Sequence, residues 1–360
     1  MLDGTLLSIA EVDLNAGPYS VCDKTGCAPS GDMQDYYSLG AYWWPNPDTS
    51  DGLPYVRRDC ERNPVTELYR EASEACDKTS MQRMVESVIS LTLCGMRHVR
   101  QDMLVHASDL IRHWFLRPET AMNPHMNFAQ VRPGHDDNNG APQGIIEARD
   151  LALLPDFFVY LAAKGFLDAA EFEGLKGWCS QFLGWLMTHP NARRERQAHN
   201  NHGTNYDLLA GALALFTGDK KCLAAVAARA KKRLPLQILP DGTQPHELKR
   251  PHKFHYCAYT LQSWLLLAEL LDAVGISLWD NGLIEKASLS LWGMLEGDIE
   301  GAKAEGFVPA RLRPIMVHIE QKTGALWAKD TLQSALLAKP PVCFHPYTGI
   351  PPFWQVVLDA

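Results

Sequence analysis

The feature that most constrains the fold is a long succession of segments in which apolar residues recur every three or four positions. This spacing places the apolar side chains on one face of an α-helix. It predicts helices over residues 65–77, 79–97, 100–116, 144–164, 168–188, 205–216, 219–232, 256–274 and 282–298. No convincing alternation of apolar and polar residues separates them. Consecutive helices joined by short turns predict an all-α fold of stacked helical hairpins.

The absence of a tetratricopeptide-type repeat favours a closed arrangement of these hairpins over an open solenoid. We therefore predict an α/α toroid, that is, an incomplete α/α barrel. Residues 1–360 are expected to form a single domain, in which 1–64 make an irregular N-terminal arm and 65–300 the helical toroid. Residues 301–360 have no predicted place in it. Three long loops are expected to line a cleft at one end: 120–143, 190–203 and 235–256.

The formal net charge of −8 at pH 7 bears on the kind of partner. Nucleic-acid binding is not expected, because the chain has no basic tail and no dominant basic stretch. An acidic protein can still bind an acidic polymer if its cleft is locally basic. Local basic groups occur at Arg57 and Arg58, at Arg193, Arg194 and Arg196, and at Lys249, Arg250 and Lys253. They are equally compatible with ordinary solvated faces.

The N-terminus and the cysteines bear on the compartment in which the protein works. No apolar run reaches the roughly 18 residues of a membrane-spanning helix, so no membrane association is expected. The start, MLDGTLLSIAEVDLN, lacks the basic segment of a signal peptide, so a secreted or periplasmic location requires that a leader has been removed. The odd number of cysteines, nine, leaves at least one thiol free or paired between chains. Cys22 and Cys27 are close enough in sequence to close a small loop in an oxidising compartment.

Two stretches concentrate polar side chains beside a predicted helix. In AHNNHGTNYDLLAGALALF, Asn200, Asn201 and His202 stand just before the helix, and helix capping explains one asparagine but not all three residues. The second stretch runs from Glu247 to Tyr256 and is either a reactive edge at the mouth of the helices or an ordinary solvated loop. It also contains Lys249, Arg250, His252, Lys253 and His255.

Other residues are candidates for binding a sugar. The flat rings of Trp43 and Trp44, in the block AYWWP, suit the apolar faces of pyranose rings, but they equally suit a local core under the N-terminal arm. Farther along, polar residues precede a helix that carries Glu147 and Arg149. Arg149 is either a clamp for a carboxylate or a structural partner of Glu147.

No metal or organic cofactor is predicted. His252 and His255 have an i,i+3 spacing, but no third ligand is evident, and His135, Asp136 and Asp137 form only a weak cluster. The chain has no HExxH motif, no phosphate-binding loop, no dinucleotide fingerprint and no G-x-S-x-G motif.

Several blocks together resemble the alginate lyase superfamily of α/α-toroid enzymes. They are DYYSLGAYWWPNPD, LPYVRRD, MNPHMNFAQ, GIIEARDL, NNHGTNYD, PDGTQPHELKR and FHYCAYTLQSWLLLAEL. They run in family order from about residue 17 to 300 and are most similar to the branch that includes lyases of alginate and of glucuronan. The resemblance implies a polysaccharide lyase that cleaves a β-1,4-linked polyuronate by syn β-elimination, with an anionic polysaccharide as substrate and no cofactor.

By position, the resemblance places the family's Asn-His pair on Asn201 and His202, its arginine on Arg250 and its catalytic tyrosine on Tyr256. The spacing from arginine to tyrosine is one residue shorter than in the better-known alginate lyases, which leaves Tyr259 as the alternative. The substrate-binding residues are expected to be Trp43, Trp44, Asn127, Arg149, Asn200 and His255.

The chemistry of β-elimination explains why these residue types are needed. H5 of a uronate is weakly acidic while its carboxylate is charged, so the enzyme must neutralise that charge with donors such as Asn201 and Arg250. His202 is a further donor or a base. In mannuronate and glucuronate, H5 and O4 lie on the same side, so Tyr256 can serve as both base and acid. A positive charge from Arg250 would favour its phenolate form.

Two other classes of function remain open at this point. The first is a non-catalytic α/α protein that binds an anionic glycan. The second is a glycoside hydrolase, which needs two suitably spaced carboxyl groups. Its candidates are Asp136, Asp137, Glu147, Asp207 and Glu247, and none of them forms a recognisable pair. Within the lyase hypothesis, poly-mannuronate is slightly favoured over glucuronan, and no oligomeric state is predicted.

Overall fold

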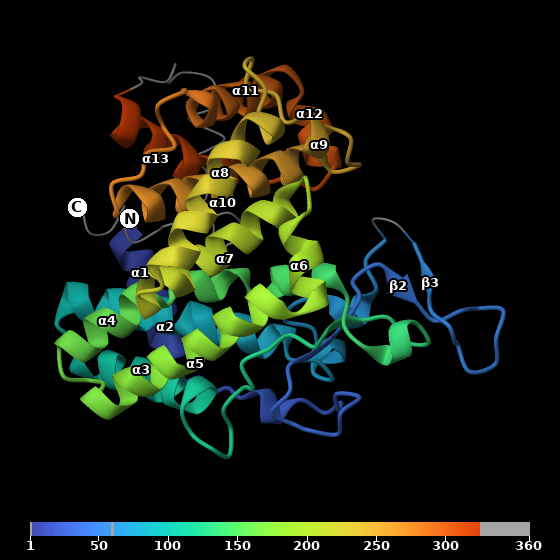
Figure 1. The fold of residues 1–360 in the computed structure, drawn as a ribbon, viewed down its shortest axis with the longest axis vertical. Coiled ribbons are helices and arrows are strands. Elements are labelled where there is room, and N and C mark those ends of the chain that lie inside the picture. The colour runs from blue at the N-terminus through green and yellow to red at the C-terminus, as the bar shows by residue number, and fades with distance from the viewer. Residues whose placement is uncertain (1, 59–60, 325–360) are drawn as a thin grey trace. The chain divides into compact units, whose positions relative to one another are not determined.

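Helices dominate the computed structural model, which describes residues 2–58 and 61–324 (Figure 1). The chain divides into two compact units. Unit 1 combines the first nine residues, Arg196–Ala212 and the chain from Asp219 onward, whereas unit 2 comprises Ala10–Glu195 and Leu213–Gly218. Helices α1 (Leu2–Asp13) and α7 (Asn201–Thr217) contribute residues to both. The single domain over the whole chain therefore stays a prediction.

Unit 2 contains the first helical hairpin. Its helices are α2 (Lys78–His98), α3 (Gln101–Phe115), the 3₁₀ helix η5 (Pro142–Leu153), α4 (Pro155–Ala163), α5 (Ala169–Thr188) and α6 (Pro190–Arg196). The sequence located α2, α3 and α5 to within a few residues: α3 and α5 each bury one apolar face, whereas α2 is buried on all sides from Ser87 to Gly95. Trp114 of α3 and Phe182 of α5 are among its fully buried side chains.

The start of α5 shows how local sequence fixes a helix end. The Asp168 carboxylate accepts a hydrogen bond from the Glu171 amide at 2.8 Å, and Glu171 accepts one from the Asp168 amide at 2.8 Å. This reciprocal arrangement is a capping box. Arg112 of α3 also forms an ion pair with Glu171 at 2.5 Å, so the beginning of α5 is tied to its neighbour.

Two predicted helices take other forms. Residues 65–77 form only the short 3₁₀ helices η2 (Pro64–Thr66) and η3 (Glu71–Ser73), and Tyr69 between them has a positive φ of 62° that no α-helix accommodates. The segment predicted over 144–164 is divided at Pro155, which has no amide hydrogen to continue the preceding helix.

The N-terminal arm is more ordered than expected. It begins with α1 and contains strands β1 (Tyr37–Leu39), β2 (Trp43–Trp44) and β3 (Val56–Arg57). Strand β1 pairs in parallel with β4 (Phe128–Val131), and β2 pairs antiparallel with β3. Cys22 and Cys27, the candidates for a disulfide, are free thiols.

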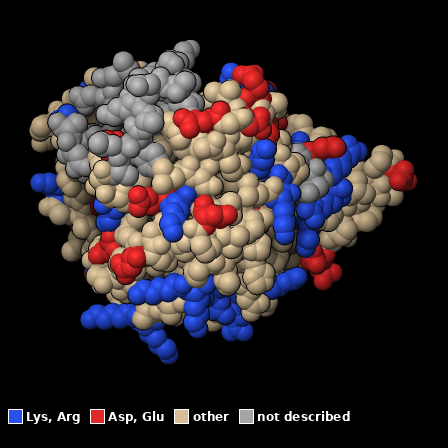
Figure 2. Space-filling model, turned by 90° about the horizontal axis from the view of Figure 1, so that it is seen from above, with Lys and Arg blue, Asp and Glu red and all other residues tan. Residues whose placement is uncertain are grey.

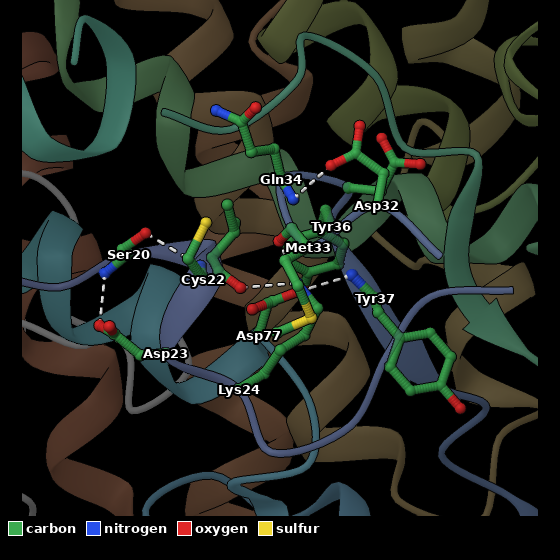
Figure 3. A network of polar contacts seen from close by, with 12 residues as sticks. Ser20, Cys22, Asp23, Lys24, Asp32, Met33, Gln34, Tyr36, Tyr37 and Asp77 are labelled. Atoms are coloured by element: carbon green, nitrogen blue, oxygen red, sulfur yellow. Dashed lines mark hydrogen bonds and ion pairs between the residues drawn. The ribbon is translucent and has the colours of Figure 1, made fainter. Parts of the chain in front are cut away.

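A buried ion pair holds this arm in place within unit 2 (Figure 3). The Lys24 ammonium lies 3.1 Å from Asp77 Oδ2, and both side chains are fully buried. Lys24 also donates to the carbonyl oxygens of Val21 and Met33, each at 2.6 Å, while the Tyr37 amide donates to Asp77 at 2.7 Å. One lysine therefore ties two loop segments to the start of α2.

Unit 1 contains the later helices of the chain. They are α8 (Lys220–Gln237), α9 (Pro245–Leu248), α10 (Lys253–Asp272), α11 (Leu283–Gly297), α12 (Ile299–Ala304), the 3₁₀ helix η6 (Pro309–Arg311) and α13 (Leu312–Thr323). Helix α10 is the central one, because Phe254, Leu261 and Trp264 are completely buried along it. The previously unplaced segment 301–360 thus contributes helix α13, and its part beyond residue 324 lies outside the described residues.

The surface carries both signs of charge. Figure 2 shows Lys and Arg side chains beside Asp and Glu on the face drawn, so a net charge of −8 leaves room for local basic areas. In residues 2–58 and 61–324, no helix is long and apolar enough to cross a membrane.

Replacing Lys24 tests the buried ion pair. We expect Lys24→Met to lower the free energy of unfolding by about 3–5 kcal/mol, because Asp77 is left buried without its cation. Burial raises the pKa of Asp77 from 3.8 to about 7, although the charge of Lys24 lowers it. The folded state therefore holds a proton that the unfolded state releases, and stability falls as the pH rises from about 4 to about 7.

Without Lys24 this fall should be steeper. Urea unfolding should therefore show a larger loss at about pH 8 than at about pH 5. Adding Asp77→Asn to the variant should remove the pH-dependent part of the loss. An equal loss at both pH values would contradict the importance of the carboxylate charge.

Candidate active site

Asn201 begins helix α7, earlier than the start near Thr204 that the sequence suggested. Its backbone amide donates to Glu247 Oε1 at 2.9 Å, and its side-chain amide nitrogen lies 3.1 and 3.0 Å from the two oxygens of the same carboxylate. Both side chains are only 2% exposed. Glu247 thus caps α7 from a different segment, where a negative charge also suits the positive end of the helix dipole.

Other polar side chains hold the first turns of α7. Gln237, at the end of α8, donates to the carbonyl oxygens of His199 and Asn200 at 2.9 and 2.8 Å. Its own oxygen accepts from Thr204 at 2.7 Å and from the Trp264 indole at 2.9 Å. All the hydrogen-bonding capacity of this buried amide is therefore used to fix the backbone in front of Asn201.

Gly203 allows the close packing of this turn. A Cβ atom at this position would lie 2.2 Å from the Ala198 carbonyl oxygen and 2.8 Å from Arg233 Nη2. Arg233 fills the space next to it, donates to the Gly203 carbonyl at 2.7 Å and pairs with buried Asp207. The glycine is thus required by a close approach and not by an unusual backbone angle.

Arg250 and Tyr256 are in direct contact. Arg250 Nη2 lies 2.8 Å from the phenolic oxygen of Tyr256, and the guanidinium carbon is 3.9 Å from the centre of the ring. Arginine can only donate, so the phenolic oxygen accepts this hydrogen bond. Both side chains are partly exposed.

A single short turn connects the two pairs. Glu247, which holds Asn201, lies three residues before Arg250, and the Arg250 amide donates to the Glu247 carbonyl at 3.0 Å. The turn begins with Pro245 in the first position of α9, where a proline is well suited. Asn201, Arg250 and Tyr256 are therefore brought together within unit 1.

The two predicted histidines also lie in unit 1. His202 follows Asn201 on α7 and is partly exposed. His255 Nδ1 is 2.8 Å from Arg311 Nη1, and its ring stacks on Tyr259 with 5.9 Å between the ring centres. Because Arg311 can only donate, His255 Nδ1 accepts, and in the neutral ring the hydrogen is on Nε2. Asn200 is half-buried, with its carbonyl oxygen bound to Gln237 as described above.

The remaining predicted substrate-binding residues lie in unit 2. Trp43 and Trp44 form strand β2, and Arg132 and Arg58 respectively lie over their rings at 5.3 and 5.0 Å. Arg149, expected as a carboxylate clamp, is only 5% exposed and already pairs with Asp150 at 2.8 Å.

Asn127 lines a groove of about 630 Å³ in unit 2. Its side-chain oxygen accepts from the Trp185 indole at 2.8 Å, and the Trp185 ring stacks on His189 with 4.7 Å between ring centres. Exposed Arg194 also lines this groove. The stacked rings and the polar edge are suited to a sugar.

Four of the five acidic residues considered for a hydrolase already have other partners, and one of them is Asp136, which pairs with Arg132. In unit 1, Asp207 is fully buried in ion pairs with Arg229 and Arg233, and Glu247 binds Asn201. In unit 2, Glu147 accepts from Ser38 and lies 3.5 Å from the ammonium of Lys78. Within the described ranges, no three His, Cys, Asp or Glu side chains are grouped so as to hold a metal ion.

Sequence analysis missed the roles of Glu247 and Gln237. The sequence indicated Glu247 as one ionisable residue among many and as a candidate carboxyl group of a hydrolase, and it gave no indication of Gln237. Their partners Asn201 and Asn200 lie 46 and 37 residues away along the chain, and no local pattern encodes such contacts. The sequence offers a local hint only for Glu247, because it follows Pro245 and His246 at the start of the short helix α9.

Two comparisons with known proteins match this chain to alginate lyases. The sequence model of the family described as "Alginate lyase" matches residues 20–291. The crystal structure of an alginate lyase from Bacteroides ovatus is similar over 93% of this chain and 92% of its own, with 28% sequence identity and a TM-score of 0.75. The likeness confirms the all-α class, and the predicted α/α toroid is consistent with it. A search of curated proteins finds no match.

Substitution of two glycines on one helix tests the packing at the start of α7. We expect Gly203→Ala to lower the melting temperature, because the added methyl group would overlap the Ala198 carbonyl. Gly211→Ala is the matched control, because its Cβ meets nothing closer than 3.4 Å and alanine favours a helix by about 1 kcal/mol. Equal melting temperatures for the two variants would contradict the close packing described at Gly203.

Proposed function

The chain belongs to the alginate lyase family, and on that premise we propose that it cleaves a β-1,4-linked polyuronate by syn β-elimination. The products would carry 4,5-unsaturated uronate ends. The observation that carries the proposal is the contact between Arg250 and Tyr256. Arg250 lies three residues after Glu247, which holds Asn201. Polymer cleavage also agrees with a secreted or periplasmic location, where such a polymer is found.

Asn201 and Arg250 are assigned to the carboxylate of the sugar. Loss of H5 creates negative charge on that carboxylate, and fixed donors stabilise it without having to reorganise. Asn201 is suited to this task because its backbone and side chain are held by Glu247. His202, the next residue on the helix, is assigned as an additional donor.

Tyr256 is assigned as the group that removes H5 and then protonates O4. A guanidinium that donates to the phenolic oxygen stabilises negative charge there, so Arg250 favours the form that accepts a proton. After H5 has moved to the phenolate, the same hydrogen is correctly placed to reach O4 when both lie on one side of the ring. This geometry occurs in mannuronate and glucuronate.

Poly-mannuronate is the first candidate substrate and glucuronan the second. The family and the similar Bacteroides ovatus structure both carry the alginate name, which supports mannuronate. The two sugars differ only at C2, away from the atoms assigned to Asn201, Arg250 and Tyr256. In unit 2, taken by itself, the aromatic and polar side chains around Asn127 are suited to binding a sugar.

A panel of polyuronates tests the substrate class. Mannuronan, guluronan, glucuronan, pectate and hyaluronan would each be incubated with the protein and followed by the ultraviolet absorbance of the unsaturated end. We expect product from mannuronan or glucuronan and little from guluronan, because H5 and O4 lie on opposite faces in guluronate. Products with only saturated ends would indicate a hydrolase, and binding without any product would indicate a glycan-binding protein.

Two tyrosine variants test the assigned acid and base. Tyr256→Phe should lower kcat by at least about 10²-fold, because the proton-transfer group is lost while the ring remains. Tyr259→Phe, one turn later on α10, is the matched control and should keep most of the activity. Circular dichroism should show both variants folded. If Tyr259→Phe is the inactive variant, the role belongs to Tyr259 instead.

A further inference from the structure

Glu247 is a buried carboxylate whose described side-chain partner is an amide and not a cation. Its two oxygens accept from the backbone and the side chain of Asn201, and no Lys or Arg in the described ranges forms an ion pair with it. Burying a carboxylate is costly unless its oxygens are satisfied. A carboxyl group in this position therefore calls for a reason beyond packing.

The chemistry of the two groups fixes the orientation of Asn201. Both oxygens of Glu247 accept from the Asn201 side chain, so the NH₂ group and not the oxygen of the Asn201 amide faces Glu247. The backbone amide of Asn201 binds the same Oε1 atom, which prevents the side chain from turning away. Asn201 consequently has one orientation, although an isolated asparagine could flip.

This orientation leaves one donor of Asn201 available. The amide nitrogen is nearly equidistant from the two Glu247 oxygens, at 3.1 and 3.0 Å. The two N–H bonds of an amide diverge too widely to point at one carboxylate together, so Glu247 takes one of them. No other described residue accepts a hydrogen bond from the Asn201 side chain. The second N–H is thus free for a ligand.

We propose that Glu247 is a positioning residue, which holds Asn201 so that this second N–H meets the carboxylate of the sugar. The inference rests on the proposed lyase function. Glu247 does not touch the reacting atoms in this scheme. It also lies on the turn that carries Arg250, whose amide binds the Glu247 carbonyl at 3.0 Å. One turn therefore sets the donor at Asn201 and the cation at Tyr256 together.

Glu247→Gln tests the requirement for an acceptor-only group. Glutamine has nearly the same shape, but its own NH₂ can face Asn201 and allow the Asn201 amide to flip. We expect kcat on the cleaved polyuronate to fall about 10- to 100-fold, as for other small losses of alignment, with a smaller change in KM. A wild-type kcat in a folded variant would overturn the proposal.

Exchanging the amide of Asn201 and the carboxylate of Glu247 tests whether the pair has only a structural role. In the double variant Asn201→Asp/Glu247→Gln, an amide and a carboxylate still face each other, so the buried hydrogen bond and the melting temperature should largely recover relative to Asn201→Asp alone. Activity should not recover, because position 201 no longer carries a donor. Recovery of both stability and activity would show that Glu247 has only a structural role.

A cycle with Asn201→Ala tests whether Glu247 acts through Asn201. Adding Glu247→Gln to Asn201→Ala should lower kcat little further, because the group to be positioned is already absent. A full additional loss would mean that Glu247 acts independently, as an acid or base of its own. If Glu247→Gln does not fold, Glu247→Asp keeps an acceptor group but draws it back from Asn201, and a wild-type kcat in this folded variant would overturn the proposal.

The wild-type protein separates this inference from the proposed function. Absence of unsaturated product from every polyuronate would refute the lyase itself. An active wild-type enzyme with unimpaired Glu247→Gln would refute only the positioning role.

Discussion

The hydrogen bonds between Asn201 and Glu247 are the constraint on which the site in unit 1 depends. They join the first residue of α7 to a turn that lies 46 residues later in the chain. The described residues provide no cation for this carboxylate. It is stabilised by the backbone and side-chain amides of Asn201, the first residue of the helix. The donors to this carboxylate belong to the proposed site itself. Burying Glu247 therefore also orders Asn201.

The same turn distributes charge in a way that suits elimination. Glu247 places a negative charge behind Asn201, whereas Arg250 places a positive charge against the phenol of Tyr256. The first arrangement orients a neutral donor and the second favours proton removal. Gln237 and Arg233 of α8 hold the backbone around Asn201 from the other side, so the donor is fixed by contacts from two directions. Because these groups are ordered before the substrate binds, little reorganisation is needed during the reaction.

The helices of the fold were predictable where one apolar face is buried, as in α3 and α5, because periodicity records that face directly. Prediction failed where backbone chemistry prevails over periodicity, at Tyr69 with its positive φ and at Pro155. The proposed reacting residues could be named because their blocks occur in family order. The pairing of Asn201 with Glu247 could not, since no periodic pattern relates residues so distant in sequence.

The identity of the polymer has to be decided outside this reacting group. Asn201 and Arg250 are assigned to the carboxylate, and Tyr256 to the hydrogen at C5 and the oxygen at C4. All of these atoms are arranged alike in mannuronate and glucuronate, which differ at C2. Residues that act on the carboxylate, the C5 hydrogen and O4 therefore cannot distinguish mannuronate from glucuronate, which differ at C2. Selectivity between the two polymers is therefore expected from side chains that reach C2, outside the proposed reacting group.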